Sequence, residues 1–111
     1  MDTSQLLKGV LDLAVMGTVI EADGYGYDIV RRLRDAGLSD VGDASVYGTL
    51  RRLFKAGFLT SYVQPSEEGP HRKYYGANER GREWFASSSV VYEDFTSCMN
   101  MLIEKGRVCL S

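Results

Sequence analysis

The chain has 111 residues, of which 44% are hydrophobic and 25% are charged, and its formal net charge is -2. This length supports one compact domain with a single core and is too short for two ordinary domains. The mixed charges exclude a disordered chain and a global basic field, so any affinity for nucleic acid must come from a local surface.

Cys98 and Cys109 are the only cysteines, with no CxxC motif and no histidine nearby. This pattern favours neither a disulfide framework nor a zinc site, and it fits a reducing compartment. The N-terminus has an acid before any base and does not resemble a signal peptide. The apolar run from Leu6 to Ile20 contains Lys8 and Asp12 and is shorter than the ~20 residues that a membrane span needs. We therefore expect a cytoplasmic protein with no membrane partner, no cofactor and no metal.

A first helix is expected from Ser4 to Ile20, with Thr3 or Ser4 as its N-cap. Apolar residues nearly encircle this segment, so it needs cover on more than one side. They are Leu6, Leu7, Val10, Leu11, Leu13, Ala14, Val15, Met16 and Val19. One explanation is a central helix of a compact bundle. The other, which we favour, is that one side packs internally and the opposite side packs against a second subunit.

The next two segments predict a helix-turn-helix pair. The second helix is expected from Tyr25 to Ala36, and Gly37 ends it. After a connection over residues 38–42, the third helix runs from Asp43, a suitable N-cap, to Gly57, a suitable residue just beyond a helix. Its apolar face contains Val46, Leu50, Leu53 and Phe54.

The opposite face of the third helix is small at its start and cationic toward its end. A helix wheel places on it Ala44, Gly48, Arg51, Arg52 and Lys55. No acid lies between the cap and the end of this helix, whereas an ordinary solvated helix would mix both signs of charge. The pattern fits a DNA recognition helix, and it also fits an amphipathic helix with exposed arginines.

Beyond the third helix the pattern changes to that of a β-hairpin. Residues 58–64 and 71–76 are rich in aromatic and β-forming residues, and PSEEGP between them is typical of a turn. A helix-turn-helix followed by a hairpin is the winged-helix arrangement, in which wing cations reach phosphates or the minor groove. The cations here are His71, Arg72 and Lys73. The alternative is a solvent-facing strand whose charge Glu67 and Glu68 partly neutralise.

A last helix is expected after Asn78, its N-cap, and runs to about Lys105. Steps of three and four residues mark an a/d seam over roughly three heptads. The seam residues are Phe85, Ser88, Tyr92, Phe95, Met99 and Leu102. A helix of ~27 residues is about 40 Å long, which exceeds a small winged-helix core. Much of the seam should therefore contact another chain, and we expect a homodimer whose interface includes Leu7 and the seam.

The predicted fold class is α+β and mostly α. It is a winged helix-turn-helix, with three helices and a β-hairpin wing, followed by a long C-terminal dimerisation helix. We expect the DNA-binding domain over residues 1–77 and the dimerisation helix over residues 78–111, which forms one compact unit with the first helix.

The chain resembles the PadR family of winged-helix transcriptional regulators, in particular its short subgroup with a single C-terminal helix. The residues that carry the resemblance are Tyr25-Gly26-Tyr27, Ser45-Val46-Tyr47 with Leu50, Arg52-Leu53, Gly57-Phe58-Leu59, Gly69-Pro70-His71-Arg72-Lys73-Tyr74-Tyr75 and Gly81. The chain departs from the family pattern at Phe54, where an acid is usual, and at Ala77-Asn78, where Leu-Thr is usual. At Phe54 we expect packing against the wing or another subunit.

The resemblance implies a homodimer that binds a near-palindromic operator in double-stranded DNA, usually as a repressor. In several members, a small planar or aromatic compound releases the DNA. Carried onto this sequence, it gives the predicted DNA-binding residues Ser45, Tyr47, Arg51, Arg52 and Lys55 of the third helix and His71, Arg72 and Lys73 of the wing. Tyr47 has an alternative role as a half-buried support of the helix.

The family's ligand cavity lies at the dimer centre between the first and last helices. The matching residues here are Leu11, Val15, Phe85, Tyr92 and Phe95. An aromatic stripe of this kind can instead be simple core.

No motif indicates catalysis, because the only histidine, His71, lies in the cationic wing and no phosphate loop or paired carboxylates occur. We expect no enzymatic activity. The rival hypothesis is a helical dimerisation or protein-interaction module without DNA binding, in which the exposed cations only increase solubility.

Overall fold

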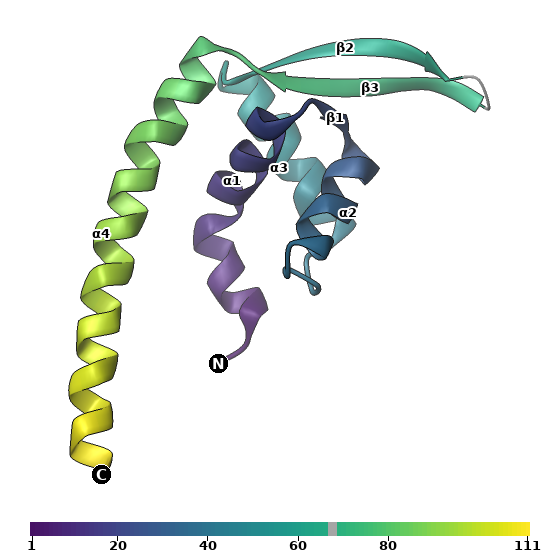
Figure 1. Cartoon of the computed structure of the whole chain (residues 1–111). Coiled ribbons are helices and arrows are strands. Elements are labelled where there is room, and N and C mark those ends of the chain that lie inside the picture. The colour runs from purple at the N-terminus through teal and green to yellow at the C-terminus, as the bar shows by residue number, and fades with distance from the viewer. Residues whose placement is uncertain (67–68) are drawn as a thin grey trace.

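The computed structural model describes residues 1–66 and 69–111, and in this part of the chain four helices accompany one antiparallel three-stranded sheet (Figure 1). The elements are α1 (Thr3–Glu21), β1 (Gly24–Tyr25), α2 (Gly26–Asp35), α3 (Asp43–Lys55), β2 (Leu59–Ser66), β3 (Gly69–Ala77) and α4 (Glu79–Leu110). This arrangement confirms the predicted fold class, a mostly helical winged helix-turn-helix with a long C-terminal helix. Glu67 and Glu68, which were expected in the hairpin turn, lie outside the described residues.

One hydrophobic core forms where α1, α2 and α3 meet the base of the sheet. The buried apolar residues are Leu7, Val15, Met16, Val19, Ile29, Val30, Leu33, Val41, Val46, Leu50, Leu53, Leu59 and Tyr75. Burying one side chain of this size contributes roughly 1.5–3 kcal/mol. The core therefore fixes α3 against α1 and α2 through the apolar face that the sequence predicts.

The first helix begins at Thr3, one residue earlier than predicted, because its N-cap is Asp2 rather than Thr3 or Ser4. The Asp2 carboxylate accepts hydrogen bonds from the Ser4 hydroxyl at 2.7 Å and from the Gln5 N–H at 3.2 Å. These two hydrogen bonds lower the pKa of Asp2, because they stabilise its charged form.

The length and composition of α1 match those of a membrane-spanning helix, although the sequence had led us to expect that it was too short. Core helices of soluble proteins have the same character. In this structure α1 packs against α2, α3 and α4, and its buried residues are Leu7, Val15, Met16 and Val19. The apolar character of α1 is thus explained in part by its central place in the fold.

The second helix begins after a short strand that the sequence analysis missed. Gly24 and Tyr25 form β1, which pairs with β3 through Gly24 opposite Tyr75 and Tyr25 opposite Tyr74. The strand order in the sheet is β1-β3-β2. The wing is therefore joined by backbone hydrogen bonds to the segment that leads into α2.

The third helix begins at Asp43, and its N-cap is Gly42, so the prediction that Asp43 caps it is wrong. The Asp43 carboxylate instead accepts a hydrogen bond from the Arg34 guanidinium of α2 at 2.8 Å. Gly57 follows the C-cap Ala56 with a φ of 87°, a left-handed conformation that favours glycine. This confirms the predicted end of the helix.

The wing is longer than the predicted strands. β2 pairs with β3 from Leu59 opposite Ala77 to Ser66 opposite Gly69, with an irregularity after Gln64. The Tyr62 hydroxyl donates a hydrogen bond to the Asp23 carboxylate at 2.6 Å. This hydrogen bond, together with partial desolvation, raises the pKa of Tyr62. The hairpin is thereby held to the α1–β1 connection as well as to β1.

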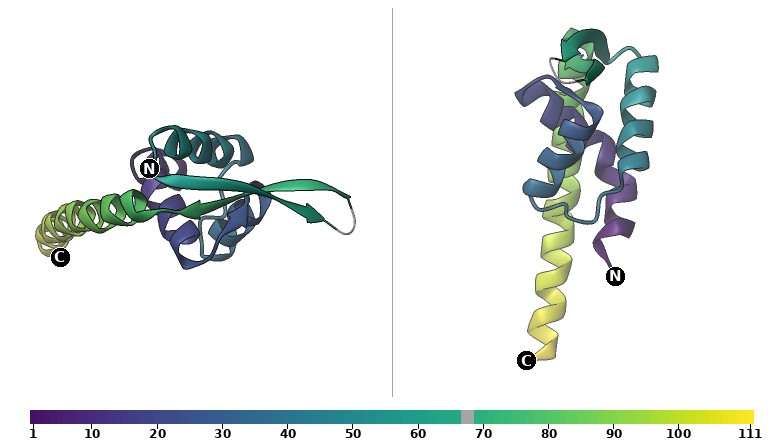
Figure 2. Two further views of the ribbon diagram at one scale, coloured as in Figure 1. Left: turned by 90° about the horizontal axis from the view of Figure 1, so that it is seen from above. Right: turned by 90° about the vertical axis from the view of Figure 1, so that its right-hand side faces the viewer.

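The last helix begins as predicted, because the Asn78 side chain accepts a hydrogen bond from the Gly81 N–H at 2.9 Å. It continues past the expected end at Lys105 to Leu110. Only its start is buried against the rest of the described chain, where Trp84 stacks on Phe58 with ring centroids 5.6 Å apart. Figures 1 and 2 show that the wing and α4 leave the helical core in different directions.

Candidate nucleic-acid interface

A cleft of about 440 Å³ lies between the start of α2, the middle of α3 and the base of the wing. We call it the wing cleft. Its lining residues are Tyr25, Gly26, Tyr27, Tyr47, Leu50, Arg51, Arg72, Lys73 and Tyr75. Four of the predicted DNA-binding residues thus come together from separate elements, and the lining contains three cations and no carboxylate. An uncompensated positive cleft beside a protruding helix can bind a phosphate backbone.

Tyr47 is half-buried in the wing cleft, and both roles considered for it remain compatible with its position. Its ring lies directly against Gly26 of α2, because a Cβ on that glycine would lie 2.5 Å from Tyr47 Cε1. The ring therefore supports the contact between α2 and α3. It also lines the cleft beside Arg51, which leaves part of its surface open to a ligand.

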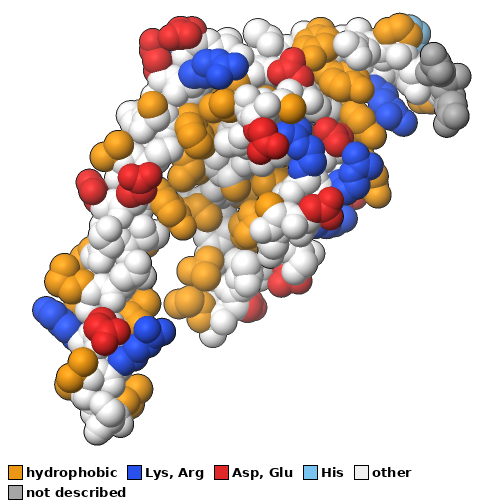
Figure 3. Space-filling model, viewed as in Figure 1, with side chains coloured by type: hydrophobic (Ala, Val, Ile, Leu, Met, Phe, Trp, Pro, Cys, Tyr) orange, Lys and Arg blue, Asp and Glu red, His pale blue; other side chains and the backbone are white. Residues whose placement is uncertain are grey.

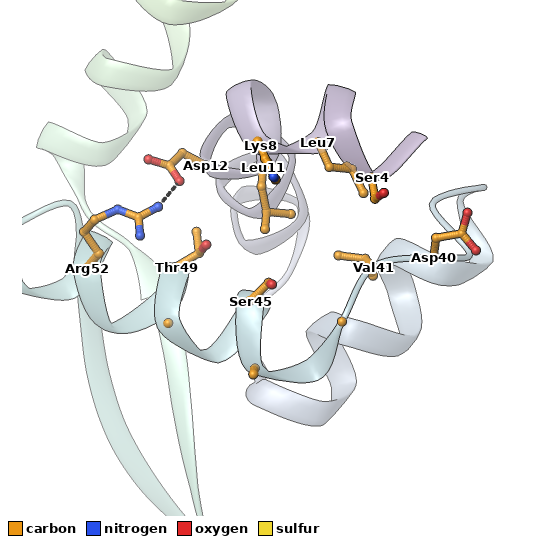
Figure 4. Close-up of a pocket in the computed structure, with 13 residues that line it drawn as sticks. Ser4, Leu7, Lys8, Leu11, Asp12, Asp40, Val41, Ser45, Thr49 and Arg52 are labelled. Atoms are coloured by element: carbon orange, nitrogen blue, oxygen red, sulfur yellow. Dashed lines mark hydrogen bonds and ion pairs between the residues drawn. The ribbon is translucent and has the colours of Figure 1, made fainter. Parts of the chain in front are cut away.

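A second hollow, of about 420 Å³, lies on the other flank of α3, between α3 and α1. We call it the α1–α3 groove. Figure 4 shows Leu7, Lys8, Leu11 and Asp12 on the α1 side and Ser45, Thr49 and Arg52 on the α3 side. Ser45 and Arg52 therefore lie on the flank of α3 away from the wing, whereas Tyr47 and Arg51 lie on the flank toward it.

The two neighbouring arginines of α3 have different environments. Arg51 is exposed and lines the wing cleft. Arg52 forms an ion pair with Asp12 of α1, with a hydrogen bond from its guanidinium to the carboxylate (Figure 4). The expectation that no acid opposes the cations of α3 is therefore wrong for Arg52, whose partner lies forty residues earlier in the chain.

Replacing Asp12 with asparagine should strengthen DNA binding, because it releases Arg52 and removes one negative charge beside α3. We expect the plot of log affinity against log salt to become steeper by up to ~0.9, the value for one further phosphate contact. Fluorescence anisotropy with a labelled duplex at several salt concentrations measures this slope. Asp40→Asn is the matched control, because Asp40 lines the same groove without pairing with Arg52. An unchanged slope in Asp12→Asn would show that Arg52 does not reach DNA.

The remaining predicted DNA-binding residues lie at the edges of this surface. Lys55, in the last turn of α3, and His71, near the start of β3, are both exposed and line neither hollow. Phe54 is 42% exposed, and the Lys73 ammonium lies over its ring. This contact agrees with the expectation that Phe54 packs against the wing.

Sequence reasoning assigned no role at this surface to several residues that line the wing cleft or control its cations. They are Tyr25, Tyr27, Tyr75 and Asp12. The Tyr25-Gly26-Tyr27 motif was a usable signal, because a glycine between two tyrosines allows the ring of Tyr47 to approach the backbone. Asp12 gave no local signal, because its partner is distant in sequence.

Val15 was predicted in the effector pocket and Leu7 in the dimer interface, and both are buried within the subunit. Val15 has no exposed surface and Leu7 is 7% exposed. Val15 thus faces the core, and Leu7 exposes only the small part that lines the α1–α3 groove, so the proposed pocket and interface rest on the other predicted residues. Leu11 is half-buried and lines the α1–α3 groove. The apolar residues encircle α1, so their spacing could not decide which of them face inward.

The seam on α4 is covered at its start and uncovered farther along. Phe85 packs on α1, where a Cβ on Gly17 would lie 3.2 Å from Phe85 Cε1. Ser88 is half-buried. The next four seam residues are exposed by 42%, 64%, 38% and 55%, in the order Tyr92, Phe95, Met99 and Leu102. Hydrophobic side chains recur along α4 as far as its C-terminal end (Figure 3).

The predicted effector residues do not line either of the two hollows described above, apart from Leu11. Within the described part of the chain, no group of three or more histidine, cysteine, aspartate or glutamate residues could hold a metal ion. Cys98 and Cys109 are exposed free thiols on α4. The surface with the clearest chemical character is therefore the cationic one formed by α3 and the wing.

Comparison with known proteins shows to which family the chain belongs. The transcriptional regulator PadR-like family matches residues 15–87, which include the C-terminal part of α1, the helix-turn-helix, the wing and the start of α4. Among curated proteins, an uncharacterised protein of Lysinibacillus sphaericus is 24% identical over 103 residues, which cover 91% of this chain and 94% of that protein.

Solved structures of regulators share the fold over nearly the whole chain. A PadR-like transcriptional regulator from Bacillus cereus is 28% identical with a TM-score of 0.79, covering 89% of this chain and 96% of that one. A Streptococcus transcriptional regulator is 31% identical with a TM-score of 0.78, covering 88% and 96%. A PadR family regulator from Eggerthella lenta is 26% identical with a TM-score of 0.80, covering 90% and 87%. On its fold, its cationic surface and these matches, the chain belongs to the PadR-like family of DNA-binding transcriptional regulators.

Proposed function

We propose that the chain is a cytosolic homodimeric repressor that binds a near-palindromic operator and releases it when a small aromatic compound binds at the dimer centre. Residues 1–77 would bind DNA, and residues 78–111 would dimerise together with α1. Members of this family are generally not enzymes, and the proposal requires no catalytic step.

The observation that carries the DNA-binding surface is the wing cleft, in which Tyr47, Arg51, Arg72 and Lys73 meet from α3 and β3. In winged-helix recognition one helix enters the major groove while neighbouring cations contact the backbone. Ser45, together with the small residues beside it, would approach base edges from the start of α3. Arg51 and the wing cations would contact phosphates, with Lys55 and His71 at the edges of the footprint.

The exposed part of the α4 seam supports the proposal that the protein is a dimer. α4 has 32 residues and is therefore about 48 Å long, longer than the core that it leaves. An exposed apolar stripe of this length on a soluble protein indicates a partner surface. Because self-complementary pairing about a twofold axis is the commonest oligomer symmetry, we assign the stripe to a second copy. The proposed interface contains Phe85, Ser88, Tyr92, Phe95, Met99 and Leu102.

The effector would bind where the two seams meet, against Leu11, Phe85, Tyr92 and Phe95. Trp84 is the only tryptophan, and it adjoins this region at the start of α4. A bound aromatic compound should therefore change its fluorescence. If no aromatic compound that weakens DNA binding changes this signal, the aromatic stripe is only a packing surface.

The DNA-binding proposal is tested by a gel shift with the duplex upstream of the chain's own gene. Arg72→Ala should weaken binding to all sequences alike and reduce the salt slope by ~0.9, because it removes one phosphate contact. Ser45→Ala should change the preference between operator variants by ~1–3 kcal/mol, because it removes a base contact. Equal, sequence-independent losses from both changes would remove α3 from the specificity of binding. Salt-independent binding would contradict the phosphate contacts.

A further inference from the structure

Among the described residues, the Arg72 and Lys73 side chains of the wing contact aromatic rings and pair with no carboxylate. The ion pairs between described residues involve Arg31, Arg32, Arg34, Arg52 and Arg107. Neither Arg72 nor Lys73 takes part in one. The Arg72 guanidinium lies 4.4 Å from the ring centroid of Tyr25. The Lys73 ammonium lies 5.4 Å from the ring centroid of Phe54 and 5.5 Å from that of Tyr75.

The contact of Lys73 joins two separate parts of the DNA-binding surface. Phe54 belongs to the last turn of α3, whereas Lys73 and Tyr75 belong to β3. Residues two apart on a strand share one face of the sheet, so the ammonium lies between a ring of its own strand and a ring of the recognition helix. Phe54 is 42% exposed, so the ammonium covers part of an aromatic surface that would otherwise meet water.

An aromatic ring holds a cation without cancelling its charge. A carboxylate at the position of Phe54 would attract the ammonium more strongly, but the resulting ion pair would have no net charge to offer a phosphate. The ring instead restricts the flexible lysine side chain before DNA arrives. Less side-chain entropy is then lost on binding, which favours affinity.

We infer that Phe54 is a positioning residue for DNA binding. Together with Tyr75 it holds the Lys73 ammonium at the edge of the wing cleft, so that α3 and the wing meet the DNA backbone as one preorganised unit. Phe54 itself contacts no base or phosphate in this arrangement; it acts through Lys73. The inference rests on the proposed contact between Lys73 and a backbone phosphate.

Substitutions at Phe54 distinguish the effect of its aromatic ring on DNA binding from the effect of its apolar volume. Phe54→Leu keeps an apolar side chain but removes the ring, and it should weaken binding to the upstream duplex by about 2- to 5-fold, within the range for ordering one flexible side chain at an interface. Phe54→Tyr keeps the ring and should restore the original affinity. Phe54→Glu should pair with Lys73 and reduce the salt slope by ~0.9. Fluorescence anisotropy over a range of salt concentrations measures all three.

A double-mutant comparison shows whether Phe54 acts through Lys73. In a Lys73→Ala background, Phe54→Leu should cause no further loss of affinity. The free protein supplies a readout that is independent of DNA, because ring currents should shift the Lys73 side-chain protons upfield in the NMR spectrum. Phe54→Leu should reduce this shift, and Phe54→Tyr should retain it.

The outcomes distinguish this inference from the proposed function. If Lys73→Ala weakens binding and Phe54→Leu does not, the wing contact stands and the role of Phe54 is refuted. An equal loss from Phe54→Leu with and without Lys73 also refutes it, because the ring would then act through another group. If Lys73→Ala leaves affinity and salt slope unchanged, the proposed wing contact is wrong and the inference fails with it.

Discussion

Replacing Phe95 with glutamate should separate the proposed dimer into monomers and reduce operator affinity by about 10²- to 10⁴-fold, because two linked DNA-binding heads gain affinity that one head lacks. Phe95 lies in the middle of the α4 seam and is 64% exposed in one subunit. Two glutamates buried at a symmetric interface would lose hydration without gaining a partner. Sedimentation velocity measures the oligomeric state, and fluorescence anisotropy measures the affinity.

Val90→Glu is the matched control for Phe95→Glu. Val90 is an apolar residue of α4 with 56% exposure, and at ~100° per residue it lies on the side of the helix opposite the seam. This change should leave both the dimer and the operator affinity intact. Circular dichroism should show folded protein for both variants, since each site is exposed within the subunit. A dimeric Phe95→Glu protein with unchanged affinity would show that the seam is not the interface.

Gly81→Ala should destabilise the fold by about 1–3 kcal/mol, the range for overpacking a close contact. A Cβ on Gly81 would overlap the carbonyl oxygen of Phe58 and lie 2.8 Å from Met16 Cε. Met16 is fully buried and the carbonyl belongs to the backbone, so neither can move far. The start of α4 would have to shift away from α1 and β2. Urea denaturation followed by circular dichroism measures the free energy of unfolding.

Gly106→Ala is the control for this change within the same helix. A Cβ on Gly106 would meet nothing within 4 Å, so only helix propensity changes. Alanine is favoured over glycine in a helix interior by roughly 0.5–1 kcal/mol, and the variant should be equally or more stable. Two variants of similar stability would show that α4 does not approach Phe58 as closely as described.

The sequence was informative about the fold where the pattern is local and strongly periodic. The apolar face of α3, the glycine that ends it and the Asn78 cap of α4 are all set by residues within one or two turns. The hairpin could be located for the same reason, because segments rich in aromatic and β-forming residues flank a turn. These features need no knowledge of distant contacts.

The features that the sequence did not reveal depend on contacts between distant residues. β1 has only two residues and exists because it pairs with Tyr74 and Tyr75 of β3. Asp43 suits an N-cap, but Arg34 of the preceding helix forms an ion pair with it. In each case tertiary structure overrides the local preference.

The candidate site was predictable in composition but not in arrangement. Helical spacing placed Arg51 and Arg52 on one exposed face, yet only Arg51 lines the wing cleft, because Asp12 of α1 pairs with Arg52. Continuous apolar character in α1 concealed the fact that Val15 faces the core. The role of Phe54 could not be seen either, since it depends on where the wing crosses the end of α3.

The central claim is that two copies place their α3 helices in major grooves on the same face of one DNA duplex. Hydroxyl-radical footprinting of the upstream duplex tests this claim most directly. We predict two protected patches related by approximate twofold symmetry and separated by about one helical turn, ~34–36 Å, or a multiple of it. One isolated patch, or protection without such spacing at concentrations where the protein is dimeric, would contradict the account.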